Sequence, residues 1–147
     1  MPKEKLLKKY FDKDGYVKLS GIEIAEMTEE KAVVCAKIEP HHLNGNGFVQ
    51  GGMLYTVADF AFAVLSNYLH PMTVTQGGQI TYLRPVKTNV LTATATETAR
   101  AGRNTVSEVT LTDDAGTVMC ICHFNGFVKD VTWDDFEKIV EQNNQKE

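Results

Sequence analysis

One carboxylate inside an apolar stretch is the first candidate for chemistry in this chain. Asp59 lies within the run Met53 to Leu65 and carries the only charge in it. A buried, unpaired carboxylate costs several kcal/mol or shifts its pKa, and aspartate is unfavourable in a helix interior. Such a residue either makes a structural hydrogen bond or a subunit contact, or it acts as a general base or nucleophile in a partly dry cleft.

A pair of glycines just before this run is the second candidate. Gly51 and Gly52 come where the helical pattern begins. The first N–H groups of a helix have no partner within it and carry partial positive charge, and glycine lets another group approach the backbone closely. The pair could therefore hold an anion or a developing oxyanion. The same two glycines could also form a simple turn.

The spacing of the two candidates predicts an oligomer. An α-helix rises about 1.5 Å per residue, so Gly51 and Asp59 of one chain lie about 12 Å apart along its axis. One chain cannot place Asp59 beside its own Gly51, whereas two such helices lying antiparallel across a two-fold axis can. If both groups act on one substrate, the protein is at least a dimer with two shared sites.

The elements that must position these groups follow from hydrophobic periodicity and turn signals. The helix of residues 53–68 is apolar on nearly every side, which predicts that other structure encloses it. The pattern predicts, in chain order, a helix over Glu4–Asp12, a hairpin of Val17–Met27 and Ala32–Ile38, an Asn- and Gly-rich loop over 41–52, the helix Met53–Tyr68, strands over Thr73–Leu83, Val90–Arg100, Arg103–Thr112 and Thr117–Val128, and a closing helix over Val131–Gln142.

This order predicts an α+β fold. Long neighbouring strands joined by short turns indicate an antiparallel meander. The economical arrangement is a curved antiparallel sheet wrapped around the central helix, with short terminal helices. We expect one domain over residues 1–147, with its core at about residues 17–130.

Composition excludes several function classes. The chain has 147 residues and a formal net charge of -4, which argues against bulk nucleic-acid binding. Its longest apolar run is shorter than the roughly 20 residues of a membrane span. Three cysteines and no secretory leader predict a cytoplasmic protein with reduced thiols. Cys120 and Cys122 should be buried in the core, and no metal-ligand pattern occurs.

A set of motifs carries a resemblance to a known family: Leu43-Asn44-Gly45, Gln50-Gly51-Gly52-Met53-Leu54-Tyr55, Ala58-Asp59, Ala61-Phe62-Ala63 and Ile80-Thr81-Tyr82-Leu83-Arg84-Pro85. Together they resemble the hotdog-fold thioesterases, most closely the phenylacetate-pathway (PaaI-type) and 4-hydroxybenzoyl-CoA thioesterase branch, over roughly residues 20 to 128. The resemblance implies the hotdog fold and an acyl-CoA thioesterase that releases a free acid and coenzyme A. It also implies a dimer or a dimer of dimers, and no cofactor beyond the coenzyme A of the substrate.

The resemblance also implies roles for four residues. Asp59 would be the base or nucleophile, and the Gly51 amide would polarise the thioester carbonyl, with Gly52 beside it. Asn44 would lie near the thioester and the leaving group. Thr75 would help to orient water.

One position departs from the family pattern. Many members have histidine immediately before the two glycines, where this chain has Gln50. Glutamine can still donate or accept a hydrogen bond, but it does not titrate near neutrality. We therefore expect Gln50 to belong to the catalytic loop without an acid–base role.

Basic residues near two turns could bind the phosphates of coenzyme A. Arg100, Arg103 and Asn104 surround the Ala101-Gly102 turn, and Arg84 ends a strand. Solvated surface residues would give the same pattern, so this assignment stays open. Among the histidines, His41 and His42 are expected to be exposed loop residues, and His123 to be an interior one.

Two other functions remain open at this point. One is a hotdog dehydratase or hydratase, which usually displays a histidine that this loop lacks. The other is a non-catalytic acyl-CoA-binding module, which Gln50 would permit.

Overall fold

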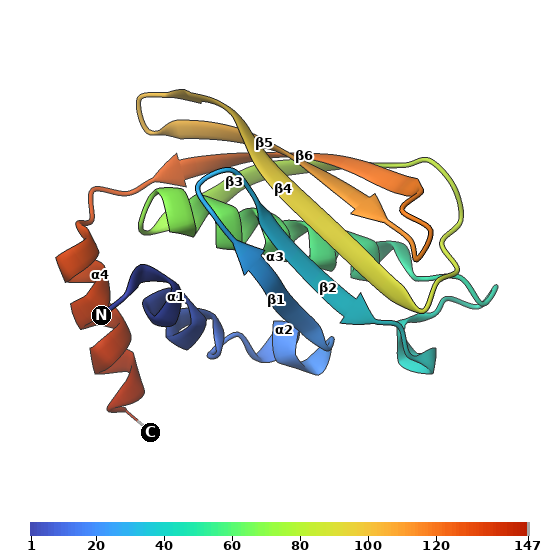
Figure 1. Cartoon of the computed structure of the whole chain (residues 1–147), viewed down its shortest axis with the longest axis horizontal. Helices are drawn as coiled ribbons and strands as arrows, with labels where there is room; N and C mark the ends of the chain where they lie inside the picture. Colours follow the sequence, from blue (N-terminus) through green and yellow to red (C-terminus); the bar gives the residue numbers. More distant parts are fainter. Residues whose placement is uncertain (147) are drawn as a thin grey trace.

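A six-stranded antiparallel sheet wraps around one long helix in the computed structural model, which describes residues 1–146 (Figure 1). The elements are α1 (Lys3–Phe11), α2 (Gly15–Leu19), β1 (Ile22–Met27), β2 (Ala32–Lys37), the 3-10 turn η1 (Pro40–His42), α3 (Gly51–Leu69), β3 (Thr73–Tyr82), β4 (Val90–Ala101), β5 (Asn104–Thr112), β6 (Val118–Val128) and α4 (Trp133–Asn144). This is the predicted α+β hotdog arrangement.

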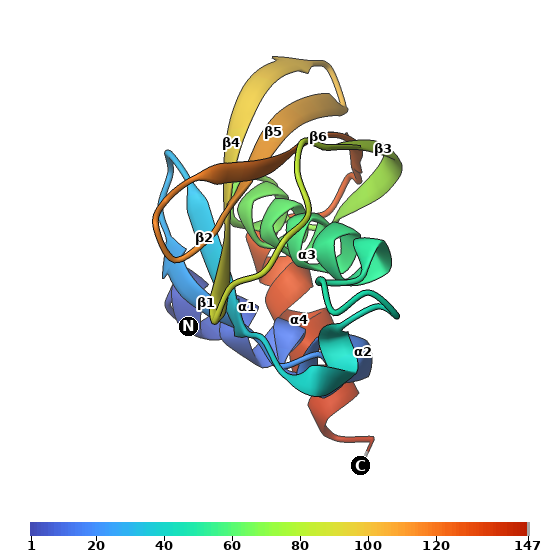
Figure 2. The same cartoon turned by 90° about the vertical axis from the view of Figure 1, so that its right-hand side faces the viewer.

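The sheet packs on α3 through buried apolar residues on its concave face. Leu91, Ala93 and Ala95 of β4 are fully buried there, and Val109 and Leu111 of β5 continue the row. Their alternation with less buried neighbours has the two-residue period of a strand with one covered face. Figure 2 shows the sheet curving from β1 on one side of α3 to β3 on the other. The expected enclosure of the apolar helix is confirmed.

The strand order differs in one respect from the predicted meander. The order is β1-β2-β4-β5-β6-β3, so of the four strands of the predicted meander only β4, β5 and β6 lie next to one another in chain order. β3 pairs with β6, and β4 pairs with β2. The connection of residues 83–89 between β3 and β4 is long enough to cross the sheet, so these two strands need not pair. The short turns after β4 and β5, by contrast, require each of these strands to pair with the next one.

A second correction concerns the start of β1. The predicted strand from Val17 is wrong at its start, where the chain forms the short helix α2. The Asp14 side chain favours this helix because it accepts a hydrogen bond from the Val17 N–H at 3.0 Å. Aspartate is a favoured N-cap residue because it satisfies a free helix-start donor in this way. The β1–β2 hairpin itself is confirmed.

The side of α3 that the sheet leaves open is covered by the terminal helices (Figures 1 and 2). Phe11 at the end of α1 meets Phe60 of α3 edge to face, with ring centroids 5.3 Å apart. Tyr10 and Phe136 join α1 to α4 at 5.0 Å. These aromatic contacts fix α1, and the α2 segment after it, beside the middle of α3.

β3 is an edge strand with little cover. Of its ten residues only Thr73 is buried, and Val74 and Tyr82 are exposed hydrophobic side chains. A long exposed edge presents unpaired backbone groups that can pair with another strand.

Among residues 1–146, none of the helices combines the length and apolar character that crossing a bilayer requires.

Candidate active site

The start of α3 presents two free backbone donors. Gln50 is the N-cap, and its side-chain oxygen accepts from the Met53 N–H at 3.1 Å. The N–H groups of Gly51 and Gly52 donate to no group among residues 1–146. These donors lie at the positive end of the helix dipole. The arrangement fits an anion or an oxyanion at the glycine pair.

Both glycines make room for a specific side chain. A methyl group on Gly52 would lie 2.7 Å from the Gln50 side-chain oxygen, so the cap needs glycine there. A methyl group on Gly51 would lie 3.1 Å from the Tyr82 hydroxyl. That hydroxyl donates to the Gly51 carbonyl oxygen at 3.0 Å, which ties the end of β3 to the first turn of α3.

An open cavity of about 600 Å³ lies over this helix start. Four of the predicted site residues line it together, namely Asn44, Gly51, Gly52 and Arg84. Phe48, Leu54, Tyr82, Leu83, Pro85 and Val86 are among its other lining residues. The cavity thus combines free backbone donors with apolar walls, as ligand sites commonly do.

Asn44 shapes the loop at the edge of this cavity. Its side-chain oxygen accepts from the N–H groups of Asn46 at 2.9 Å and Phe48 at 3.2 Å. This local closure is the usual structural use of asparagine in turns. The side-chain nitrogen has no partner among the described residues, so it is free to donate to a ligand.

Asp59 lies two turns further along α3 and is half-buried. Burial raises the pKa of its carboxyl group above the usual range, and the nearby carboxylate of Asp14 raises the pKa further. The Thr75 side chain acts in the opposite direction, as a hydrogen-bond donor to the carboxylate. Desolvation and a like charge both disfavour the ionised form. The pKa of Asp59 is therefore shifted towards neutrality, which is the direction that a general base requires.

Within one chain, the predicted site is divided into two parts, the cavity at Gly51 and the pair of Asp59 and Thr75. Asp59 and Thr75 do not line the cavity at Gly51, and the helix separates Asp59 from Gly51 by about 12 Å. The less buried residues of α3 form one stripe along the helix, which includes Gly52, Tyr55, Asp59 and Ala63. This stripe and the exposed β3 strand leave both halves open to a second molecule.

The arginines around the β4–β5 turn form a third, separate group. Arg100, Arg103 and Asn104 are exposed. Arg103 pairs with Asp130 at 3.6 Å, and Arg100 bonds to the Gly102 carbonyl at 3.1 Å and to His70 at 2.8 Å. They do not line the cavity of Gly51, so the structure does not bring them to the other predicted residues of the same chain.

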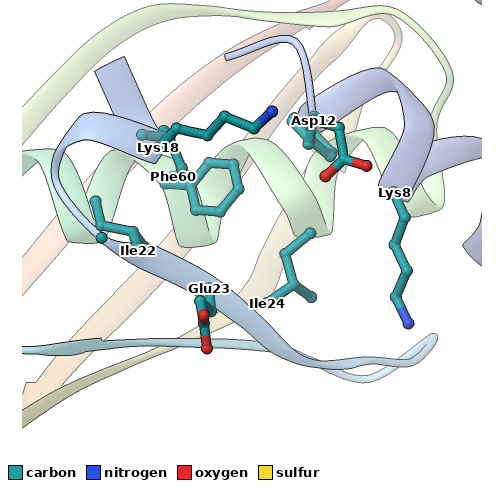
Figure 3. Close-up of a pocket in the computed structure, with 10 residues that line it drawn as sticks. Lys8, Asp12, Lys18, Ile22, Glu23, Ile24 and Phe60 are labelled. Carbon is teal, nitrogen blue, oxygen red and sulfur yellow. The ribbon is translucent and has the colours of Figure 1, made fainter. Parts of the chain in front are cut away.

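A second cavity, of about 410 Å³, lies on the Phe60 side of α3, between α1, α2 and β1. Figure 3 shows Phe60 there among Lys18, Ile22 and Ile24. None of the predicted site residues lines it.

Two histidine predictions were wrong. His42 is 5% exposed, because its ring accepts from the Glu39 N–H at 2.9 Å and donates to the Ser20 carbonyl at 2.8 Å. His123 lies on the outer face of β6 with its side chain 56% exposed, paired with Glu108 at 3.2 Å. A strand among apolar residues still turns every second side chain outward, which explains the error.

The cysteine prediction is confirmed. Cys120 and Cys122 are buried, and burial raises the pKa of their thiols to about 11 and about 12. Thiols that hold their protons this tightly are poor nucleophiles and metal ligands. In the part of the chain that the structure describes, no cluster of His, Cys, Asp and Glu could hold a metal ion.

Three residues with contacts around the site were not predicted from the sequence. Tyr82 lies in one of the family-like motifs, but its contact with Gly51 spans 31 positions and has no local signature. Asp14 could have been found as an N-cap signal, although its influence on Asp59 could not. The sequence around His70 indicates only the end of a helix, whereas its ring contacts two strand residues, Glu97 and Arg100.

Comparison with known protein sequences gives two matches. A sequence model of the thioesterase superfamily matches residues 46–120, about half of the chain. The acyl-coenzyme A thioesterase PaaI of Escherichia coli (strain K12) is 37% identical over 86 residues, which cover 58% of this chain and 61% of that protein. The chain thus spans about three fifths of the length of this curated relative.

Comparison with solved structures gives the same fold. The structure of the E. coli PaaI protein from the phenylacetic acid degradation operon matches with a TM-score of 0.81 and 26% identity, over 86% of this chain and 93% of that one. A hypothetical thioesterase protein from Streptococcus pneumoniae TIGR4, solved with coenzyme A, matches with a TM-score of 0.74 and 27% identity, over 84% of this chain and 96% of that one.

Proposed function

The chain belongs to the thioesterase superfamily, and from this premise we propose that it is an acyl-CoA thioesterase that hydrolyses its substrate to a free acid and coenzyme A. One observation carries the proposal. A single helix, α3, combines unpaired N–H groups at its first turn with a half-buried carboxylate of raised pKa, Asp59. The relative named as an acyl-coenzyme A thioesterase and the structural match solved with coenzyme A support the substrate class.

The proposed active unit is a dimer with shared sites. The exposed β3 edges of two copies would pair, and the two α3 helices would then lie side by side in opposite directions. The Gly51 end of one helix would meet the Asp59 of the other, which removes the 12 Å gap of the single chain. A two-fold axis would create two equivalent sites, and a dimer of dimers would keep them.

The proposed chemistry uses the groups of both copies. The thioester carbonyl accepts a hydrogen bond from the Gly51 N–H, with the Asn44 amide close by and the apolar walls around the acyl group. Asp59 of the other copy takes a proton from water that Thr75 helps to hold, and the resulting hydroxide adds to the carbonyl carbon. The oxyanion is stabilised at the helix start until the carbon–sulfur bond breaks and the coenzyme A thiolate leaves. In the alternative route, Asp59 attacks directly and water then cleaves the mixed anhydride.

The experiment that tests this proposal removes one N–H and little else. Proline is tolerated at the first position of a helix, and Gln50 already has the extended backbone, φ -64° and ψ 138°, that a following proline requires. Gly51→Pro should therefore fold and lose about 10²–10³ in kcat with acyl-CoA substrates. The assay follows release of free thiol from a panel of aryl and aliphatic acyl-CoAs.

The matched control is Gly51→Ala. It adds the same contact with the Tyr82 hydroxyl, 3.1 Å from the new methyl group, but keeps the N–H. We expect a much smaller loss of kcat in this variant. Equal losses in the two variants would contradict a role for the amide, and a wild-type protein that binds acyl-CoA but releases no thiol would contradict the function itself.

A further inference from the structure

The C-terminal end of α3 carries a polar cluster that the proposed chemistry does not use. His70 caps the helix, and its Nε2 lies 2.9 Å from Glu97 Oε1 of β4. Arg100 donates to His70 Nδ1 at 2.8 Å and, through Nε, to the Gly102 carbonyl at 3.1 Å. The hydroxyl of Thr105, a fully buried residue of β5, donates to the same Glu97 oxygen. We refer to these four side chains, His70, Glu97, Arg100 and Thr105, as the His70 cluster.

The hydrogen bonds fix the state of the imidazole. A guanidinium has donors and no acceptor, so Nδ1 of His70 must accept from Arg100. Nε2 then carries the proton and donates it to Glu97. Both ring nitrogens are occupied, which leaves His70 no lone pair for a substrate. Its role is therefore to hold Arg100 in place rather than to exchange protons.

A β-bulge in β4 brings the cluster together. Glu97 is opposite Ser107, and Arg100 is opposite Thr105, with the register shift lying between Glu97 and Ala99. Ser107 and Thr105 are two positions apart and share the concave face, where both are buried. In a regular strand, residues three apart point to opposite faces. The bulge turns Arg100 to the same face as Glu97 and His70.

The guanidinium keeps free donors after these contacts. Its Nη2 nitrogen has no partner among residues 1–146, and the residue is exposed. A guanidinium held in one orientation suits phosphate oxygens, because its charged N–H donors already point in a fixed direction. Arg103 lies beyond the same turn, with only an exposed partner, Asp130, at 3.6 Å. The hairpin end is thus a positively charged site at which Arg100 Nη2 is an oriented, free donor.

The distance along α3 relates this site to the proposed reaction. Asp59 and His70 are separated by about 16 Å of helix rise. In coenzyme A, the extended pantetheine arm separates the phosphates from the thioester by a distance of the same order as this helix rise. We propose that His70 is a positioning residue that, supported by Glu97 and Thr105, orients Arg100 to bind a phosphate group of coenzyme A whose thioester lies at the Asp59 of the same chain. This inference rests on the proposed function for its ligand.

The test compares a ligand with phosphates and one without. His70→Phe keeps the size of the ring and removes both hydrogen bonds. It should raise KM for acyl-CoA and the calorimetric Kd for coenzyme A about tenfold, the loss expected for one charge-assisted contact, with kcat unchanged. Hydrolysis of the matching acyl-pantetheine, which has no phosphate beyond the arm, should not change. Arg100→Ala should add little to the loss in a His70→Phe background, because both changes remove the same contact.

The control variant is His123→Phe. It removes a histidine–glutamate pair of similar length, 3.2 Å, on the outer face of β6, where no arginine takes part. Both ligands should behave as with wild type. The inference is overturned if His70→Phe leaves the Kd for coenzyme A unchanged, or if it impairs the acyl-pantetheine reaction equally, as a purely structural role would. A wild-type protein that binds coenzyme A without hydrolysing thioesters would refute the proposed function, and the ratio of Kd values would still test His70.

Discussion

Among single residues, Asp59 is one whose ionised form destabilises the fold. Its pKa is raised, chiefly by burial and then by Asp14, so the folded protein holds a proton there at pH values where the unfolded chain has lost it. Folding stability therefore falls as the pH rises from the ordinary aspartate pKa through the raised one. Above both values, the ionised carboxylate keeps a net destabilising effect in the fold.

Asp59→Asn should accordingly be more stable and inactive. We expect a higher Tm at pH 7, with the gain vanishing below the ordinary pKa of aspartate, because the wild-type carboxyl is then neutral too. Thiol release should fall by about 10²–10⁴, the usual contribution of a general base. Thermal melts across pH and the thiol assay check both effects. A variant that is less stable at pH 7 would contradict the assigned cause of the pKa shift.

The two neighbours of Asp59 should move the pH profile in opposite directions. Asp14 raises the pKa of Asp59, and Thr75 lowers it. Because Asp59 must be ionised to act as a base, kcat/KM falls below its pKa. Asp14→Asn keeps the N-cap, since asparagine caps as well as aspartate, and should shift the acid limb of kcat/KM to lower pH. Thr75→Val should shift it to higher pH. Acid limbs that coincide in all three proteins would refute the coupling.

At the scale of elements, the packing of β3 against α3 depends on one of two adjacent glycines. A methyl group on Gly78 would overlap the Tyr55 hydroxyl and lie 2.6 Å from the buried ring of Phe124. A methyl group on Gly77 would meet nothing within 4 Å. The strand approaches the helix closely only because position 78 has no side chain.

Gly78→Ala should destabilise the fold by about 1–3 kcal/mol, the usual cost of overpacking. Gly77→Ala is the matched control and should change stability by less than about 1 kcal/mol in either direction. Urea unfolding of the two variants and wild type measures the difference. Equal free energies of unfolding would mean that β3 and Phe124 can separate without cost.

At the scale of the whole molecule, the shared-site proposal predicts complementation between two inactive proteins. In a dimer of one Gly51→Pro chain and one Asp59→Asn chain, one site combines an intact amide with an intact carboxylate, and the other has neither. Random mixing of equal amounts after unfolding and refolding should recover about a quarter of wild-type activity. If each chain used its own Gly51 and Asp59, the mixture would stay inactive.

Most of the elements, and the groups available for reaction, can be predicted from the local sequence. The all-round apolar character of residues 53–68 requires an enclosing sheet, and the charge of Asp59 inside that run makes it a candidate for chemistry whatever the fold. Both inferences depend on composition and local period, which are properties of neighbouring residues.

Contacts between distant residues depend on the three-dimensional fold and could not be predicted in this way. The placement of β3 beside β6, the bond from Tyr82 to Gly51, the effect of Asp14 on Asp59 and the closure of the His70 cluster all join segments far apart in the chain. Such contacts follow from strand order, from the bulge in β4 and from the packing of the N-terminal helices beside α3. A bulge changes which face a side chain takes without leaving a clear mark in the local sequence.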